Sequence, residues 1–306
     1  MRDVSEIREE PRAALATGKP VVALESTVIA HGLPRPQNME AAHAMEAAVR
    51  ESGAVPATIG ILDGKIIVGL THHEIGRLVE AENVIKVSRA DVAAVVAGKR
   101  TGATTVASTM LIAAMAGIRT FATGGIGGVH RGAESSMDVS ADLTELSRTQ
   151  VATVCAGAKA ILDLPRTLEV LETLGVPVVG FGTHEFPAFY CCKSGLNLLH
   201  SVSNPGDAAE IMKTQWTMPS AQTGGILFVN PPPAGCALPK EEMEKLIAMA
   251  IAEATMQNVR GKEATPFLLR EVARLSQGKT LKANIGLLIS NARLAGQISV
   301  AYSALK

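Results

Sequence analysis

Aromatic side chains are scarce in this chain and make up 3% of its 306 residues. So few rings argue against a surface on which the bases of a single-stranded nucleic acid would stack. Acidic and basic residues balance at 29 each, so the chain carries no overall field that would attract nucleic acid or an anionic membrane. A local basic pocket for a small anion remains compatible with this balance.

Long apolar runs are also missing. No window reaches about 18 uninterrupted apolar residues, so we expect no membrane-spanning helix. The N-terminal stretch 1–18 is charged and lacks the apolar core of a signal peptide. No C-x-x-C pair occurs among Cys155, Cys191, Cys192 and Cys236, which argues against a zinc site or a redox motif. We therefore expect reduced thiols and a cytoplasmic protein.

Short apolar segments alternate with helical patterns along the chain. The predicted strands are 21–24, 58–62, 65–70, 120–123, 151–155, 176–181 and 225–229. The predicted helices are 39–51, 90–98, 104–116, 165–175, 241–257, 265–275 and 284–304. Asp63 and Gly64 separate two strands and predict a β-hairpin. This alternation predicts an α/β fold, a three-layer α/β/α sandwich around a mixed, mostly parallel sheet. We expect one domain over 1–306, with 1–18 as a charged N-terminal helix or arm.

A glycine-rich segment, 124–132, follows a predicted strand and reads GGIGGVHRG. Its spacing does not fit a dinucleotide-binding loop, because His130 stands where the third glycine belongs. Nor is there a P-loop, since Ala273 replaces the first glycine before Gly278-Lys-Thr. Backbone N–H groups beside His130 and Arg131 suit a single phosphate, although a tight structural turn would use the same glycines.

Two acidic residues, Asp138 and Asp142, follow this segment with Ser140 between them. Two carboxylates suit a hard cation such as Mg²⁺ or Mn²⁺ rather than zinc. Ser140 or Asp142 could equally cap the next helix, and capping is the commoner role for a lone pair of acids.

A lysine and a glutamate are candidates for catalysis. Lys159 lies in CAGAKAIL, at a predicted switch from strand to helix. Small neighbours and the positive end of a following helix would favour the neutral amine, which can attack carbon. An ordinary solvated lysine is the alternative, and the same two interpretations apply to Lys86. Glu25 ends an apolar strand, where apolar neighbours would raise its pKa enough for proton donation, unless it is only a capping or turn acid.

Long motifs in a fixed order resemble the pseudouridine-5′-phosphate glycosidases, the indigoidine synthase A-like family. The resemblance runs from about Pro20 to the last predicted helix. The motifs that carry it are ALESTVIAHG at 23–32, PQN at 36–38, KVSR at 86–89, GATTVAST at 102–109, the whole of 121–163, FPAF at 186–189, TPFLL at 265–269 and Asn284-Ile285.

This resemblance implies the reversible cleavage of pseudouridine 5′-phosphate with water to uracil and ribose 5-phosphate. It also implies a divalent metal, typically Mn²⁺, and a homotrimer. By residue match, Glu25 is the proton donor, Lys159 the nucleophile and Asp138 the metal ligand. The positions that match substrate contacts are Lys86, Val106, Ser140, Ala141, Asp142 and the active-site asparagine Asn284.

The bond to be broken is a C–C bond, and an amine nucleophile makes its cleavage reasonable. Glu25 would protonate the ribose ring oxygen, Lys159 would bond to the former anomeric carbon, and loss of uracil would leave an imine. A Schiff-base phosphosugar aldolase would use the same lysine and phosphate loop. A non-enzymatic nucleotide-binding protein would bind without forming an imine. We expect neither nucleic acid nor a membrane among the partners.

Overall fold

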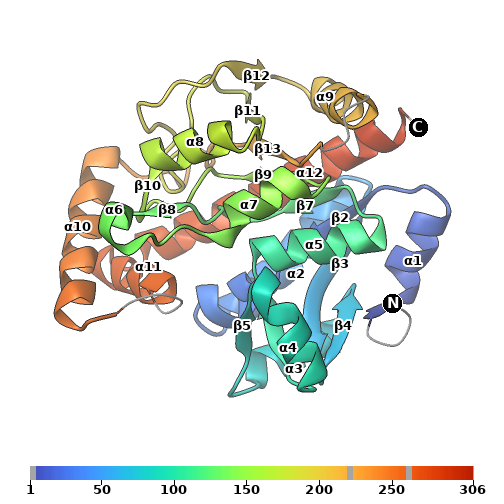
Figure 1. Ribbon diagram of the computed structural model, residues 1–306, viewed down its shortest axis with the longest axis horizontal. Coiled ribbons are helices and arrows are strands. Elements are labelled where there is room, and N and C mark those ends of the chain that lie inside the picture. The colour runs from blue at the N-terminus through green and yellow to red at the C-terminus, as the bar shows by residue number, and fades with distance from the viewer. Residues whose placement is uncertain (1–4, 219–222, 260–263, 306) are drawn as a thin grey trace.

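The computed structural model describes residues 5–218, 223–259 and 264–305. An 11-stranded sheet crosses the molecule in the order β1-β4-β3-β2-β7-β9-β13-β11-β12, with β6 and β5 branching from β3 (Figure 1). Its strands are β1 (Ser5–Ile7), β2 (Val21–Leu24), β3 (Val55–Leu62), β4 (Lys65–Val68), β5 (Ile85–Val87), β6 (Gly102–Thr104), β7 (Thr120–Ala122), β9 (Ala152–Cys155), β11 (Val178–Phe181), β12 (His200–Val202) and β13 (Ile226–Val229). A separate two-stranded sheet pairs β8 (Val129–His130) with β10 (Leu162–Asp163).

The sheet is mixed and mostly parallel, as the sequence predicts. Every pairing along the path from β3 through β2, β7, β9 and β13 to β12 is parallel. The predicted hairpin is confirmed, because β4 runs antiparallel to β3 across Asp63 and Gly64. Strands such as β2 and β9 are buried along their whole length, which explains their continuous apolar sequence.

Helices cover both faces of the sheet. They are α1 (Glu9–Ala16), α2 (Gln37–Glu51), α3 (His72–Glu80), α4 (Val92–Ala97), α5 (Val106–Ala116), α6 (Ala133–Ser136), α7 (Ala141–Arg148), α8 (Leu164–Thr173), α9 (Pro205–Thr217), α10 (Lys240–Met256), α11 (Ala264–Leu275) and α12 (Lys279–Ser303), with a π-helical turn η1 (Val28–Gly32) and a 3₁₀ turn η2 (Arg89–Asp91). In Figure 1, α5 and α7 lie in front of the central strands and α12 behind them, where it packs on α2 and α9. The three-layer α/β/α prediction is confirmed.

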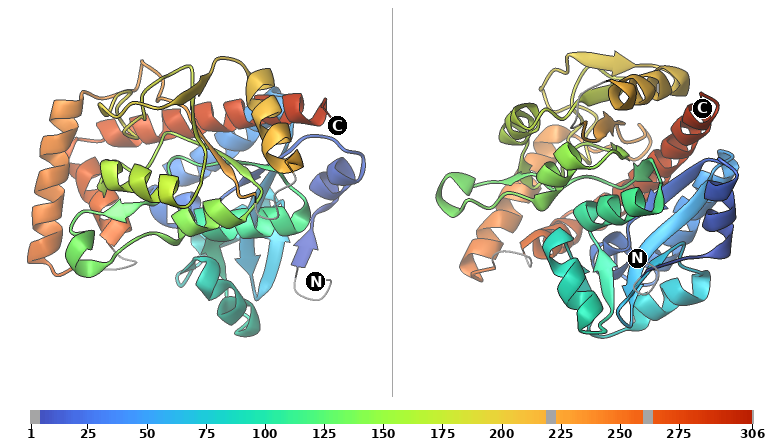
Figure 2. Two further views of the ribbon diagram at one scale, coloured as in Figure 1. Left: turned by 45° about the horizontal axis from the view of Figure 1, so that its top comes forward. Right: turned by 45° about the vertical axis from the view of Figure 1, so that its right-hand side comes forward.

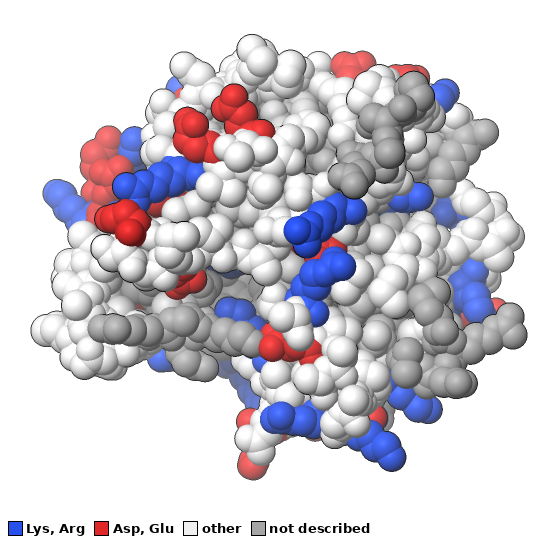
Figure 3. All heavy atoms as spheres, in the orientation of Figure 1, with Lys and Arg blue, Asp and Glu red and all other residues white. Residues whose placement is uncertain are grey.

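Helices α10 and α11 pack on each other at one end of the molecule (Figure 2). Charged side chains of both signs are interspersed over the face in Figure 3, in keeping with the balanced composition. Among the described residues, no helix combines the length and the apolar character needed to cross a membrane.

Local sequence features explain many helix ends. Thr71 and Glu74 form a capping box at the start of α3, a pattern that marks helix starts. Pro165 lies in the first turn of α8 as predicted. Gly117 ends α5 in the left-handed conformation, with a φ of 84°, which glycine adopts without strain.

Several boundaries differ from the prediction. Thr104 belongs to β6 rather than to the following helix, since α5 begins at Val106. Helix α12 begins at Lys279, five residues before the predicted start, and Gly278 precedes it with a φ of 81°. Within the predicted arm 1–18, residues 9–16 form α1, while 5–7 form a strand parallel to β4; residues 1–4 lie outside the described part.

Candidate active site

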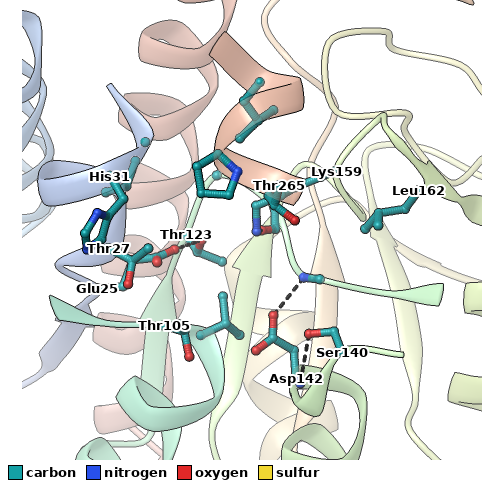
Figure 4. Close-up of a pocket in the computed structure, with 18 of the residues that line it drawn as sticks. Glu25, Thr27, His31, Thr105, Thr123, Ser140, Asp142, Lys159, Leu162 and Thr265 are labelled. Atoms are coloured by element: carbon teal, nitrogen blue, oxygen red, sulfur yellow. Dashed lines mark hydrogen bonds between the residues drawn. The ribbon is translucent and has the colours of Figure 1, made fainter. Parts of the chain in front are cut away.

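A cavity of about 360 Å³ opens at the carboxyl ends of the central parallel strands. Glu25 follows β2, Thr123 follows β7, and Lys159 comes from the loop after β9. Ligands of open α/β sheets bind at this edge, where successive loops meet. Figure 4 shows Glu25 and Thr123 on one side of the cavity, with Ser140 and Asp142 below Lys159.

Nearly all the predicted site residues line this one cavity. They are Glu25, Lys86, Val106, His130, Asp138, Ser140, Ala141, Asp142, Lys159 and Asn284. Arg131 is placed elsewhere: it is exposed and lines a second hollow, which Leu162, Pro165 and Lys240 also border. His130 and Arg131 therefore line different hollows, and their joint role in binding one phosphate stays a prediction.

Glu25 is buried, with 7% of its surface exposed. This burial raises the pKa of its carboxyl above the ordinary value. The charges of Lys159 and Lys86 and the hydroxyl of Thr123 oppose the shift, whereas Asp142 adds to it. The direction of this shift is the one expected from the sequence, and a neutral carboxylic acid in a cavity can donate a proton.

Lys159 is half-buried in the loop that joins β9 to β10. Its Nζ donates a hydrogen bond of 2.8 Å to the carbonyl oxygen of Gly125, and its backbone N–H donates to Ile126 at 3.1 Å. The helix expected to follow Lys159, with Pro165 in its first turn, is found as α8, which begins at Leu164, and β10 lies between it and Lys159. The glycine-rich segment, rather than a helix end, holds the amine in the cavity.

Part of the backbone of the glycine-rich segment is engaged within the protein. Four of its N–H groups donate to protein acceptors, and they belong to Ile126, Gly127, Val129 and His130. The glycines allow close packing: a Cβ on Gly125 would lie 2.6 Å from the ring of Phe189. These four hydrogen bonds hold the segment as a tight turn, and its role in binding a phosphate stays a prediction.

Asp142 ties three elements together. Its Oδ1 accepts a 2.9 Å hydrogen bond from Ala107 N–H at the start of α5, and its Oδ2 accepts one of 2.7 Å from Gly127 N–H. Ser140 caps α7, because its Oγ accepts from Asp142 N–H at 3.2 Å. The capping interpretation of Ser140 is confirmed (Figure 4). The carboxylate of Asp142 already occupies the positive end of α5, which would otherwise suit a substrate anion.

Asp138 lies at the cavity with a side chain that is 40% exposed, and its Oδ2 is 3.9 Å from His130 Nδ1. Burial lowers the pKa of His130, although the charge of Asp138 opposes this. The described residues hold no group of three or more His, Cys, Asp or Glu side chains suited to a metal. A single accessible carboxylate does not fit a zinc site, but it fits Mg²⁺ or Mn²⁺, which keep several waters and share their coordination with substrate phosphates.

Sequence reasoning did not single out Thr123, Thr105 or Phe189, all of which line the cavity. The strand-end rule that identified Glu25 could have found Thr123, because it closes the predicted strand 120–123. Phe189 reaches the site from a distant loop, and nothing local in the sequence predicts this.

Known proteins resemble this chain over almost its full length. The family model described as "Indigoidine synthase A like protein" matches residues 10–301. A pseudouridine-5′-phosphate glycosidase of Caldanaerobacter subterraneus is 53% identical over 98% of this chain and 97% of its own length. One of Staphylococcus aureus is 52% identical over the same shares.

Two solved structures have the same fold. The prealnumycin C-glycosynthase AlnA, in complex with ribulose 5-phosphate, is 40% identical with a TM-score of 0.91 over 99% of this chain and 98% of its own. An indigoidine synthase A-like protein of Thermotoga maritima is 39% identical, with a TM-score of 0.89 over 98% and 97% of the two chains. The chain therefore belongs to the indigoidine synthase A-like family.

Proposed function

We propose that this protein is a pseudouridine-5′-phosphate glycosidase, an enzyme that reversibly converts pseudouridine 5′-phosphate and water to uracil and ribose 5-phosphate. The observation that carries the proposal is the convergence of a buried acid, Glu25, and a tethered amine, Lys159, on one cavity. It is supported by relatives of this name that are about half identical to the chain. AlnA holds ribulose 5-phosphate, a five-carbon sugar phosphate like the proposed product.

The chain's own residues suffice for a balanced sequence of steps. Glu25 gives its proton to the ribose ring oxygen as the sugar opens, and Lys159 as the neutral amine forms a C–N bond to the former anomeric carbon. The C–N bond leaves the Lys159 nitrogen with an extra proton; the nitrogen releases it, which restores its lone pair, and uracil C5 takes up a proton in turn. The C–C bond then breaks with its electron pair remaining on uracil, and the lone pair of the Lys159 nitrogen forms the imine. Water hydrolyses the imine, which releases ribose 5-phosphate, restores the amine and returns a proton to Glu25.

The remaining cavity residues would bind and orient the substrate. We assign the sugar and phosphate contacts to Lys86, Val106, His130, Asn284 and the start of α7, where Ser140, Ala141 and Asp142 lie. Asp138 would hold Mn²⁺ or Mg²⁺. Such a cation supplies positive charge that offsets the substrate phosphate.

We further propose that the protein is a homotrimer in the cytoplasm. The resemblance of the sequence to this family supports contacts between copies. The most exposed apolar side chains are Leu199 at 88%, Met137 at 82% and Met256 at 71%. The four cysteines are free, which suits a reducing compartment.

The decisive experiment is to incubate the protein with pseudouridine 5′-phosphate and Mn²⁺ and to measure uracil by chromatography. Borohydride added during turnover should trap a sugar-phosphate adduct on Lys159, and Lys159→Ala should release no uracil. Lys213→Ala, on the exposed surface of α9, is the matched control and should keep full activity. A trapped adduct without any uracil would indicate the aldolase instead, and no adduct would contradict the imine mechanism.

The metal assignment has its own test. Removal of divalent cations with a chelator should abolish uracil release, and Mn²⁺ should restore it. In Asp138→Ala, the concentration of Mn²⁺ needed for half-maximal activity should rise by roughly 10- to 100-fold, the loss typical when metal coordination is disturbed. Full activity of the metal-free wild type would refute a metal requirement.

A further inference from the structure

Both polar groups of the Thr123 backbone, the N–H and the carbonyl oxygen, make hydrogen bonds within the protein. Its N–H donates to Val154 of β9 at 3.0 Å, and its carbonyl oxygen accepts from Asn291 Nδ2 at 2.8 Å. Asn291 is fully buried on α12, and its Oδ1 accepts in turn from Asn230 Nδ2 at 3.0 Å. Because strand and helix fix this backbone, the position of the Thr123 hydroxyl depends on a single side-chain torsion.

The hydroxyl of Thr123 donates to Oε1 of Glu25, and both side chains are buried (Figure 4). The pairing of β2 with β7 places Leu24 opposite Ala122, so the residues that follow these two strands meet at the cavity wall. A buried hydroxyl is well suited to stabilise a carboxylate here, because hydrogen bonds to charged groups are stronger than those between neutral groups.

We infer that Thr123 is a positioning residue for Glu25. Its hydroxyl donates to Oε1, so that Oε2 carries the proton that is transferred to the sugar. Once this proton has left, the same hydrogen bond stabilises the carboxylate that remains. The inference rests on the proposed role of Glu25 as proton donor and adds a residue that acts through it.

The surroundings of Glu25 show why this hydrogen bond matters. Burial is the largest influence on the carboxyl and raises its pKa; the charge of Asp142 acts in the same direction. The charges of Lys159 and Lys86 and the hydrogen bond from Thr123 lower it. Among these groups, Thr123 is the uncharged one that favours the ionised carboxyl of Glu25. Removal of its hydroxyl should therefore raise the pKa of Glu25 and make it a weaker acid.

The test compares three variants. Thr123→Val keeps the shape and removes the hydroxyl, while Thr123→Ser keeps the hydroxyl. Thr120→Val is the matched control, because Thr120 is buried on β7, the strand that Thr123 follows, and its Oγ1 has no hydrogen-bond partner among the described residues. Thr123→Val should lower kcat about 10- to 100-fold, the worth of one hydrogen bond to a charged group. The alkaline limb of its pH profile should move to higher pH.

Thr123→Ser should retain most of the wild-type kcat and an unshifted profile, and Thr120→Val should match the wild type. A substrate-free measurement separates this inference from the proposed function. The infrared band of the protonated Glu25 carboxyl, identified by its absence in Glu25→Gln, should disappear at higher pH in Thr123→Val than in the wild type.

Two results would overturn the inference. The first is a Thr123→Val variant whose kcat and whose Glu25 titration match those of the wild type. The second is an equal loss of kcat in Thr123→Ser and Thr123→Val, which would point to packing of the methyl group. If the wild type releases no uracil while the infrared titration still shifts, the proposed function fails and the positioning role stands.

Discussion

Glu25 illustrates how burial can set the role of one residue. Removal from water disfavours its carboxylate, and this effect exceeds the opposing influence of Lys159 and Thr123. Lys159, in contrast, is half-buried and donates to a carbonyl group. The cavity therefore keeps an acid that can give up a proton beside an amine that can form a bond to carbon.

The raised pKa of Glu25 predicts a specific pH dependence of stability. An unfolded chain ionises this group near pH 4.3, whereas the folded protein keeps it protonated to higher pH. The contribution of the protonated group is fully present below the unfolded pKa and is lost as pH rises through the folded pKa. Relative to Glu25→Gln, the free energy of unfolding of the wild type should therefore fall as pH rises from the unfolded pKa to the folded pKa of Glu25. Above the folded pKa, the difference between the two proteins should stay constant.

Urea unfolding at a series of pH values measures this difference in the free energy of unfolding. Glu40→Gln is the control, since Glu40 is exposed on α2 and should follow the wild type. Parallel curves for the wild type and Glu25→Gln would show that Glu25 titrates normally. In turnover, Glu25→Gln should be slower by roughly 10²–10⁴-fold, as expected for loss of a general acid.

Single residues also show which parts of the site could be predicted from the sequence. Glu25 was identifiable because it ends a buried strand, and Ser140 because capping is local. Arg131 was grouped with His130 because the two are adjacent in the sequence. However, His130 ends β8 and faces the cavity, whereas Arg131 lies in the turn that follows this strand. Arg131 accordingly lines the other hollow.

At the scale of elements, the site depends on contacts between segments far apart in the sequence. Asp142 links α5, α7 and the glycine-rich segment through backbone N–H groups. The sequence predicted a polar turn and a glycine loop here, but it could not predict that the two would bind each other. The hydrogen bond from Gly127 N–H to Asp142 fixes the glycine-rich segment against the start of α7.

An ion pair joins η2 to α7, and we expect it to contribute to the stability of the fold. Arg89 Nη1 donates to both carboxylate oxygens of Glu145, at 2.7 and 2.6 Å. The Arg89 side chain is 44% exposed and that of Glu145 1%. Arg89→Ala would leave a buried carboxylate with fewer donors, so unfolding should become easier by about 1–3 kcal/mol.

Chemical denaturation measures this loss, and Arg148→Ala on exposed α7 surface should stay within about 0.5 kcal/mol of the wild type. Because η2 follows Lys86 and Ser88 while α7 begins beside Ser140, the variant should also raise KM for the substrate. An unchanged free energy of unfolding would mean that Thr149, which also donates to Glu145, is sufficient alone.

At the scale of the whole molecule, the alternation of buried strands and helices was enough to predict the sandwich. Parallel strands covered on both faces have continuous apolar sequences, as in β2 and β13. The strands β1, β5, β6 and β12, of three residues each, were not predicted from the sequence. Strand order was not predicted either, since pairing is decided by long-range packing rather than by local sequence.

The cavity draws on residues from Glu25 to Asn284, so a ligand that fills it should stabilise the whole fold. Binding at a hundredfold excess over Kd adds about 2.7 kcal/mol. Ribose 5-phosphate should therefore raise Tm by on the order of 5 °C in a chain of this size, whereas ribose, which lacks the phosphate, should raise it little. Thermal scans of the wild type with either sugar measure this difference.

Two variants then locate the phosphate. Lys86 lines the cavity and Arg131 does not. Lys86→Met should remove most of the Tm increase with ribose 5-phosphate, because it deletes a cation at the cavity wall while keeping the length of the side chain. Arg131→Ala should preserve the increase, since the guanidinium lies in the second hollow. If Arg131→Ala instead abolished the shift, the phosphate would bind at that hollow or to Arg131 of another copy, and contacts between copies would then be part of the site.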